Sequence, residues 1–273
     1  MKGCKWVMFL AAHLVANATS AQVPTLPDGA DTHWTVEQPQ EIVASVLFDP
    51  ATVEDRLPPV LRFITVGELA DQGLPWATAH LAANPSHGGW GISFLEFVRM
   101  EVCEIDGRSP VWPKHGAAAL WLARVAPADS TVDLGLGVPL LELEFWMPDS
   151  LFAAYMRDKG LYASYGDADL GRSRGGTWRG SLNVNGLRVV AKCTPTGPIE
   201  GGEKSRGMQV FYPPLSSSMT TVVRVAFSGH RIQECAEESA WRFHGTHPLA
   251  GGIVLGPSTY QFGYHLVGGV YRR

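Results

Sequence analysis

Short apolar or alternating runs, separated by Gly, Pro and Asp, dominate the sequence. Runs of this length bounded by turn residues are typical of strands in antiparallel sheets. We predict strands at residues 42–48, 61–66, 76–82, 92–102, 117–125, 138–146, 177–184, 187–194, 208–212, 221–227 and 253–266.

Two segments carry helix signals instead. Asp49 can cap a helical turn over residues 51–57, with Pro50 at its first position and a Pro-Pro pair after it. Residues 149–159 place four apolar side chains on one helical face, with Gly160 available to end the helix. Helices are therefore expected to be few.

Turn chemistry and the balance of elements indicate the fold class. Asn185-Gly186 joins two predicted strands and is typical of a β-hairpin, because both residues tolerate positive φ. No internal repeat is visible. We predict a β-rich α+β fold: a single closed or partly closed β-barrel with a few peripheral helices.

The length of 273 residues is enough for one core, and 45% of the residues are hydrophobic. We expect one domain at residues 42–273, preceded by an extended lead-in at residues 22–41. A helix and loop segment at 149–176 is expected as an insertion that forms a lid or an interface.

The first 21 residues resemble a secretory signal, with Lys2 and Lys5 before a short apolar stretch and small residues near Ala21. We therefore expect a secreted or periplasmic protein, the alternative being a cytoplasmic protein with an apolar N-terminus. Cleavage would leave Cys103, Cys193 and Cys235, enough for one disulfide and one thiol.

The charge pattern excludes some partners. The formal net charge is −4 and the basic residues are scattered, which argues against nucleic acid. No run after the N-terminus approaches transmembrane length. A small organic substrate or ligand is the expected partner, with no cofactor and no metal, and a homo-oligomer remains open.

Four stretches, taken in order, carry a family resemblance: LFDPATVEDRLPPVL (47–61), DLGLGVPLLELEF (133–145), GSLNVNGLRVVAKCTPTG (180–197) and VVRVAFSGHRIQECAEESAWRFHGTHPLA (222–250). In order and spacing they resemble the acetoacetate decarboxylase-like superfamily. The resemblance implies a β-barrel fold and chemistry on a keto-acid, through an imine formed by a lysine in an apolar pocket.

The chain departs from the family at the position of this lysine. Matching Pro139 to the proline of the Gly-x-x-x-x-Pro-Lys-Lys segment places Leu140 at the catalytic lysine and Leu141 at its cationic neighbour. Leucine can form no imine. The N-terminal arginine of the family also has no match around residues 36–41.

Carboxylates on the same strand offer replacement chemistry. Regular alternation sends Glu142, Glu144 and Trp146 to the side of Leu140, so an inward Leu140 implies inward carboxylates with raised pKa values. The alternative is the opposite register, which leaves both carboxylates on a solvated face.

Glu96 lies on the same strand face as Phe94, Val98 and Met100. The family's pocket glutamate falls at Ile92 in an ungapped match, and a small insertion moves it to Glu96. A carboxylate among apolar neighbours is either a functional acid or a strand-end residue that reaches water.

Lys192 is the lysine on the predicted central hairpin and is a candidate for a relocated imine lysine. The alternative is an outward-facing strand lysine, since lysine is seldom buried unpaired. His244 and His247 form either a pair of loop side chains over the barrel mouth or two metal ligands without a third.

Trp90 and Trp241 match aromatic residues of the family, beside its glutamate and in its late loop. With Leu140, Glu144, Trp146 and His244 they are candidates to line a pocket for a flat or apolar ligand.

These residues support three functions. The first is a lyase- or isomerase-type enzyme on a small keto-acid or polyketide-like molecule, with Glu96 and Glu142 in acid/base roles and no Schiff base. The second is a non-catalytic carrier of a small apolar ligand. The third is a decarboxylase that uses Lys192.

Overall fold

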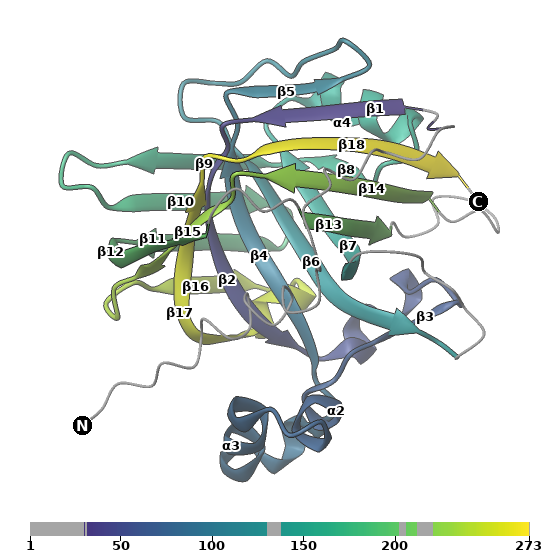
Figure 1. Ribbon diagram of the computed structural model, residues 1–273, viewed down its shortest axis with the longest axis vertical. Coiled ribbons are helices and arrows are strands. Elements are labelled where there is room, and N and C mark those ends of the chain that lie inside the picture. Colours follow the sequence, from purple (N-terminus) through teal and green to yellow (C-terminus); the bar gives the residue numbers. More distant parts are fainter. Residues whose placement is uncertain (1–29, 31, 130–137, 202–205, 212–220, 273) are drawn as a thin grey trace.

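The computed structural model describes residues 30, 32–129, 138–201, 206–211 and 221–272. Its main element is a large sheet of 14 strands, ordered β12-β15-β17-β2-β4-β6-β7-β13-β14-β18-β1-β5, with β3 on β6 and β8 on β7 (Figure 1). Most neighbours are antiparallel, and β7 pairs in parallel with both β13 and β8.

The strands of the large sheet have the following bounds: β1 Thr32–Glu37, β2 Gln40–Phe48, β3 Leu61–Phe63, β4 Gly91–Arg99, β5 Val102–Ile105, β6 Ala118–Pro127, β7 Val138–Met147, β8 Ala163–Tyr165, β12 Pro195–Gly201, β13 Arg206–Phe211, β14 Thr221–Ser228, β15 Arg231–Cys235, β17 Ile253–Phe262 and β18 His265–Arg272. A second sheet, ordered β16-β11-β10-β9, contains β9 Asp167–Arg172, β10 Trp178–Val184, β11 Leu187–Cys193 and β16 Trp241–Gly245.

The large sheet curls so that one of its faces encloses an apolar cluster. Val98 of β4, Leu140 of β7 and Val270 of β18 belong to this one cluster, although β4 and β18 are far apart in the strand order. We call this concave side the interior. The order ends at β12 and β5, so the β-rich prediction is confirmed while a closed barrel is not.

The opposite side of β2, β4, β6 and β7, here called the outer face, packs against the second sheet. Phe97, Trp121 and Leu141 from the large sheet share a cluster with Leu182 and Val189 from the small one. These central strands are therefore buried on both faces, which explains their nearly continuous apolar sequence.

In the described part of the chain the helices are few and peripheral, as predicted. They are α2 Val66–Asp71, α3 Pro75–Ala83 and α4 Ser150–Asp158, with 3₁₀ turns η1 Pro50–Thr52, η2 Glu54–Arg56, η3 Pro85–Gly89 and η4 Pro248–Gly251. Asp49 caps η1, and a capping box of Thr65 and Glu68 begins α2. Figure 1 shows α2 and α3 together at one end of the large sheet.

The predicted strand at 76–82 is wrong, because this segment is helix α3. Pro75 stands at the first helical position, and the alanines that follow favour a helix over a strand. The predicted strand 253–266 is in fact two strands, β17 and β18, since Gly263 turns the chain with a φ of 72°.

Several strands of the large sheet lie mainly where none was predicted: β1, β5, β8, β12 and β15. The lead-in expected at 22–41 supplies β1, which pairs with β18 and β5. The residues between the predicted strands 187–194 and 208–212 supply β12, which pairs with β15. Both lie at or near a sheet edge, where one-sided burial weakens the apolar pattern.

The hairpin at Asn185-Gly186 is confirmed: Val184 pairs with Leu187 and Gly186 has a φ of 75°. Cys193 and Cys235 form a disulfide that links β11 of the small sheet to β15 of the large one. Cys103 is a buried free thiol. Within the described ranges, the longest helices are too short to pass through a bilayer.

Candidate active site

A β-bulge in β7 divides the candidate carboxylates between the two faces of the sheet. Trp121 of β6 lies opposite Glu144, and the next residue, Leu122, lies opposite Glu142, so Leu143 is an extra residue in β7. The bulge reverses the alternation of side chains beyond it. Uniform alternation through residue 146 is therefore a wrong prediction.

Before the bulge, Leu140 and Glu142 point into the interior together with their neighbour Leu122. After it, Glu144 and Trp146 lie on the outer face. Glu142 is 1% exposed and Glu144 is 7% exposed, so the alternative of two solvated carboxylates is wrong as well.

Three glutamates occupy the interior face of the strands β2, β4 and β7. Glu41 on β2 alternates with the outer-face residue Ile42, and Glu96 on β4 alternates with the outer-face residues on either side of it. Glu96 pairs with Val43, two residues from Glu41 along β2. Glu142 lies on β7, separated from β4 by one strand. The structure thus brings Glu96 and Glu142 together and adds Glu41.

Burial favours the protonated form of Glu41 and Glu96, and repulsion from the neighbouring acids adds to it at Glu96. Burial raises the pKa of Glu41 to about 7, although a hydrogen bond from Tyr264 opposes this increase. The pKa of Glu96 lies well above its usual value, because of burial and then because of repulsion from Glu41 and Glu142. Near neutral pH the interior therefore holds a protonated carboxylic acid.

Tyr264 extends this acidic group toward the turn between β17 and β18. Its hydroxyl donates to Glu41 Oε2 at 3.0 Å. Burial, together with the charges of Glu41 and Glu96, raises the pKa of Tyr264 well above its usual value. The phenol therefore acts as a hydrogen-bond donor near neutral pH. His230 contacts the Tyr264 ring edge-on, with centroids 5.3 Å apart.

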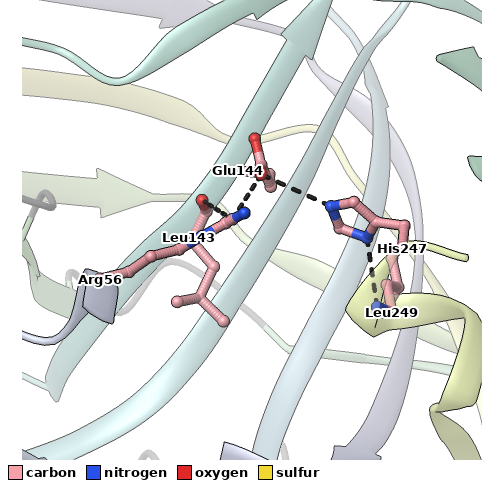
Figure 2. A network of polar contacts seen from close by, with 5 residues as sticks. All are labelled: Arg56, Leu143, Glu144, His247 and Leu249. Carbon is pink, nitrogen blue, oxygen red and sulfur yellow. Dashed lines mark hydrogen bonds and ion pairs between the residues drawn. The ribbon is translucent and has the colours of Figure 1, made fainter. Parts of the chain in front are cut away.

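The outer face of β7 holds a different arrangement, shown in Figure 2. Arg56 forms an ion pair with Glu144 and donates to the carbonyl oxygen of Leu143, the bulge residue, at 3.1 Å. His247 Nε2 lies 3.5 Å from Glu144 Oε1, while its Nδ1 accepts a hydrogen bond from the backbone of Leu249 at 3.2 Å. Glu144 is therefore a carboxylate held by cationic and N–H groups.

Several candidate residues lie away from the interior acids. Lys192 is on the exposed side of β11, in phase with Arg188 and Val190, so the desolvation that an imine lysine needs is absent there. His244 is exposed on β16, and it is His247 rather than His244 that faces Glu144. The predicted role of Lys192 is thus not supported by its position.

The tryptophans do not form one pocket. Trp90 stacks on His87 near α2 and α3, with centroids 4.3 Å apart. Trp241 stacks on Phe97 on the outer face and donates to Ser258 Oγ at 2.6 Å. Trp146 also packs on the outer face. Neither Trp90 nor Trp241 lies on the interior side with the acids.

No group of three or more His, Cys, Asp or Glu side chains suited to a metal ion occurs in the part of the chain that the structure describes. The polar interior side chains Glu41, Glu96, Glu142 and Tyr264 are carboxylic acids and a phenol.

The residues missed at the sequence level are Glu41, Tyr264 and Arg56. Glu41 was detectable, because extending the predicted strand 42–48 by one residue places it in phase with Val43. Tyr264 and Arg56 carried no local signal: each meets its partner from a position far away in sequence, 223 residues in one case and 88 in the other.

Comparison with solved structures agrees with this geometry at the level of fold. An acetoacetate decarboxylase from Legionella pneumophila superposes with a TM-score of 0.55 at 11% identity, covering 96% of this chain and 95% of that one. The chain has the acetoacetate decarboxylase-like fold. No family model matches its sequence, and no curated protein does.

Two further structures share this acetoacetate decarboxylase-like fold. The enduracididine biosynthesis enzyme MppR, complexed with pyruvate, has a TM-score of 0.53 at 13% identity and covers 91% of each chain. An acetoacetate decarboxylase-like enzyme from Sphingomonas wittichii has a TM-score of 0.51 at 16% identity, covering 94% of this chain and all of that one. The resemblance stated from the sequence is confirmed as a likeness of fold.

Proposed function

We propose that this protein is an enzyme that acts on a small keto-acid by acid/base catalysis between interior carboxyl groups, without a Schiff base. The observation that carries the proposal is the placement of Glu96 and Glu142 on the same interior face, with Glu142 two residues from Leu140 on β7. Leu140 is 4% exposed and has no nucleophilic atom. An imine cannot form at this position, whereas the interior acids can move protons.

The two carboxyl groups suit opposite roles. Glu96, whose pKa is raised by burial and by its acidic neighbours, is the proton donor to the carbonyl oxygen of the substrate. Glu142 is the base that removes a proton from the carbon next to that carbonyl. One proton enters and one leaves, so the product of the step is an enol, the common intermediate of isomerisation, dehydration and cyclisation.

The structural neighbours support the substrate class and not the individual step. MppR was solved with pyruvate and also with the condensation product of pyruvate and imidazole 4-carboxaldehyde. Two other neighbours are described as an acetoacetate decarboxylase and an acetoacetate decarboxylase-like enzyme. Small 2- and 3-keto acids are therefore the first substrates to test.

Enolisation can be measured before the true substrate is known. The protein is incubated in D₂O with pyruvate or acetoacetate. Loss of the signals of the protons on carbons next to the keto group is followed by ¹H NMR. We expect exchange above the uncatalysed rate, reduced roughly 100-fold or more in Glu96→Gln, since general acid catalysis contributes about 10² to 10⁴. Glu144→Gln is the matched control, because this carboxylate is on the outer face.

Three outcomes would contradict the proposal. Exchange at the same rate in Glu96→Gln would remove Glu96 from the reaction. Binding without exchange in the wild-type protein would favour the carrier function instead. Borohydride treatment with pyruvate should leave no covalent adduct, and an adduct at any lysine would restore the imine mechanism.

We also propose that the protein is exported. The disulfide between Cys193 and Cys235 supports this, because disulfides persist mainly in oxidising compartments. Fractionation of cells that express the full chain should recover it outside the cytoplasm with both cysteines oxidised. Recovery in the cytoplasm with both thiols free would contradict export.

A further inference from the structure

Arg124 is a cation that faces the interior from β6. Its neighbours in phase, Leu120 and Leu122, belong to the interior cluster, while Ala123 and Val125 belong to the outer one. Arg124 pairs directly with Leu140 across the β6–β7 ladder. The arginine therefore stands opposite the leucine that occupies the expected lysine position.

The guanidinium of Arg124 has no partner among the described residues. Its Nε is buried and makes no hydrogen bond there, and no ion pair to it is seen within the described ranges. The side chain nevertheless keeps part of its surface exposed. Other arginines differ: Arg56 pairs with Glu144 and Arg62 with Glu68.

An unpaired guanidinium in this position is costly for the protein. Arginine stays charged in proteins, so it cannot avoid desolvation by losing its proton. Burial lowers the pKa of Arg124, which shows the direction of this cost. A buried charge is normally paired, and a planar guanidinium is matched in shape by a carboxylate.

We propose that Arg124 is the binding subsite for the carboxylate of the ligand. The inference rests on the proposed function, in that it assumes a keto-acid in the interior, and it assigns the group that holds the acid end of that molecule. Glu142 lies on the diagonal of the ladder from Arg124, one residue pair away. A carboxylate on Arg124 therefore places the keto group of a keto-acid, and the proton-bearing carbon next to it, toward Glu142.

Binding of pyruvate and of its neutral ester methyl pyruvate tests the assignment. Affinities are measured by NMR titration on wild-type, Arg124→Met, Arg124→Lys and Arg188→Met proteins. We expect Arg124→Met to weaken pyruvate binding roughly 10- to 100-fold, as loss of a charge-assisted hydrogen-bonded pair implies, and to leave methyl pyruvate unchanged. The pyruvate affinity of Arg124→Lys should lie between those of the wild type and Arg124→Met, because lysine keeps the positive charge without the planar guanidinium.

Arg188 is the matched control, since it is an exposed arginine on β11, and its methionine variant should bind pyruvate like the wild type. Arg124→Met should fold, because it removes an unpaired charge from the interior, and a urea midpoint at or above that of the wild type checks this. If Arg124→Met does not fold, the stabilising effect of the ligands tests the subsite instead. Pyruvate but not methyl pyruvate should then stabilise the wild type, and pyruvate should stabilise Arg124→Lys less.

The possible failures are distinguishable. Equal pyruvate affinity in Arg124→Met and wild type, or no saturable pyruvate binding to the wild type, would overturn the subsite. The subsite would also be overturned, while the proposed function stands, if deuterium exchange depends on Glu96 and its KM is the same in Arg124→Met as in the wild type. Binding that depends on Arg124 without any exchange would remove the enzyme and leave the subsite.

Discussion

The two faces of strand β7 carry chemically identical side chains in opposite environments. Glu144, on the outer face, is matched by Arg56 and lies beside His247. Glu142, two residues earlier, faces an interior that also contains Glu41 and Glu96. A single extra residue at Leu143 separates these two environments.

The difference shows which carboxylate is structural. A carboxylate that meets a cation and fixes a bulge carbonyl is tied to the fold, because its charge is satisfied in the resting protein. Buried acids whose pKa values are raised, as those of Glu41 and Glu96 are, do not stabilise the fold in their ionised form. This difference supports the proposal that the outer face stabilises the fold while the interior carries the chemistry.

The largest expected effect comes from removing the cation of the outer face. Arg56→Met leaves the mostly buried Glu144 without its ion pair and leaves the carbonyl of Leu143 without its donor. We expect the free energy of unfolding to fall by about 3 to 4 kcal/mol, the range for breaking a buried pair on one side. Urea unfolding measures it.

Arg62→Met is the matched control for this variant. Arg62 pairs with Glu68 at a surface position, with side-chain exposures of 47% and 33%. An exposed pair contributes less than about 1 kcal/mol. Similar losses in the two variants would contradict the structural role of the outer network.

The interior should make the protein less stable as the pH rises. The folded-state pKa of Glu41 is raised to about 7, so the folded protein holds a proton that the unfolded chain releases near 4.5. This contribution is complete below pH 4.5 and is lost as the pH rises through 7. Between pH 5 and pH 8, the free energy of unfolding should therefore fall by about 2 to 3 kcal/mol less in Glu41→Gln than in the wild type.

Urea unfolding at both pH values compares Glu41→Gln with the wild type. Glu37→Gln is the control, because Glu37 is exposed on β1. An identical pH dependence in Glu41→Gln and wild type would show that Glu41 is ionised in the folded protein at pH 5, which would contradict the interior electrostatics.

The smallest effect concerns His247. His247→Ala removes the side chain that accepts the N–H of Leu249 at the start of η4 and faces Glu144. We expect a loss of about 1 kcal/mol, typical of one cap. Thermal unfolding checks it, and deuterium exchange of the keto-acid should stay unchanged, since the residue is on the outer face. If His247→Ala lost deuterium exchange of the keto-acid without losing stability, the outer face would take part in the reaction, which contradicts its purely structural role.

The sequence predicted strands well where both faces of a strand are apolar, as in β2, β6 and β7. It failed at α3, where an alanine-rich segment after Pro75 resembles a strand by apolar content alone. The edge strand β12 lacks the pattern because none of its residues is buried. β1 does bury alternate residues, but Thr32 is polar, so only Trp34 and Val36 mark the buried face in the sequence.

For the site, residue type and phase along the strand predicted Glu96 on the interior face. The same reasoning would have included Arg124, which is in phase with Leu122 on a predicted strand. The assignment of Glu144 failed because no local signal marks the bulge at Leu143. Its stabilising partner, Arg56, comes from another part of the chain, and alternation rules describe only local geometry.

The central claim, that the interior holds protonated carboxylic acids, is tested most directly by ¹³C NMR titration of protein labelled at the glutamate carboxyl carbons. The account predicts one carboxyl titrating near pH 7 that disappears in Glu41→Gln, and another with a pKa well above 4.5 that disappears in Glu96→Gln. If every glutamate instead titrates close to the usual value of about 4.3, the interior acids are ionised at neutral pH and the account is wrong.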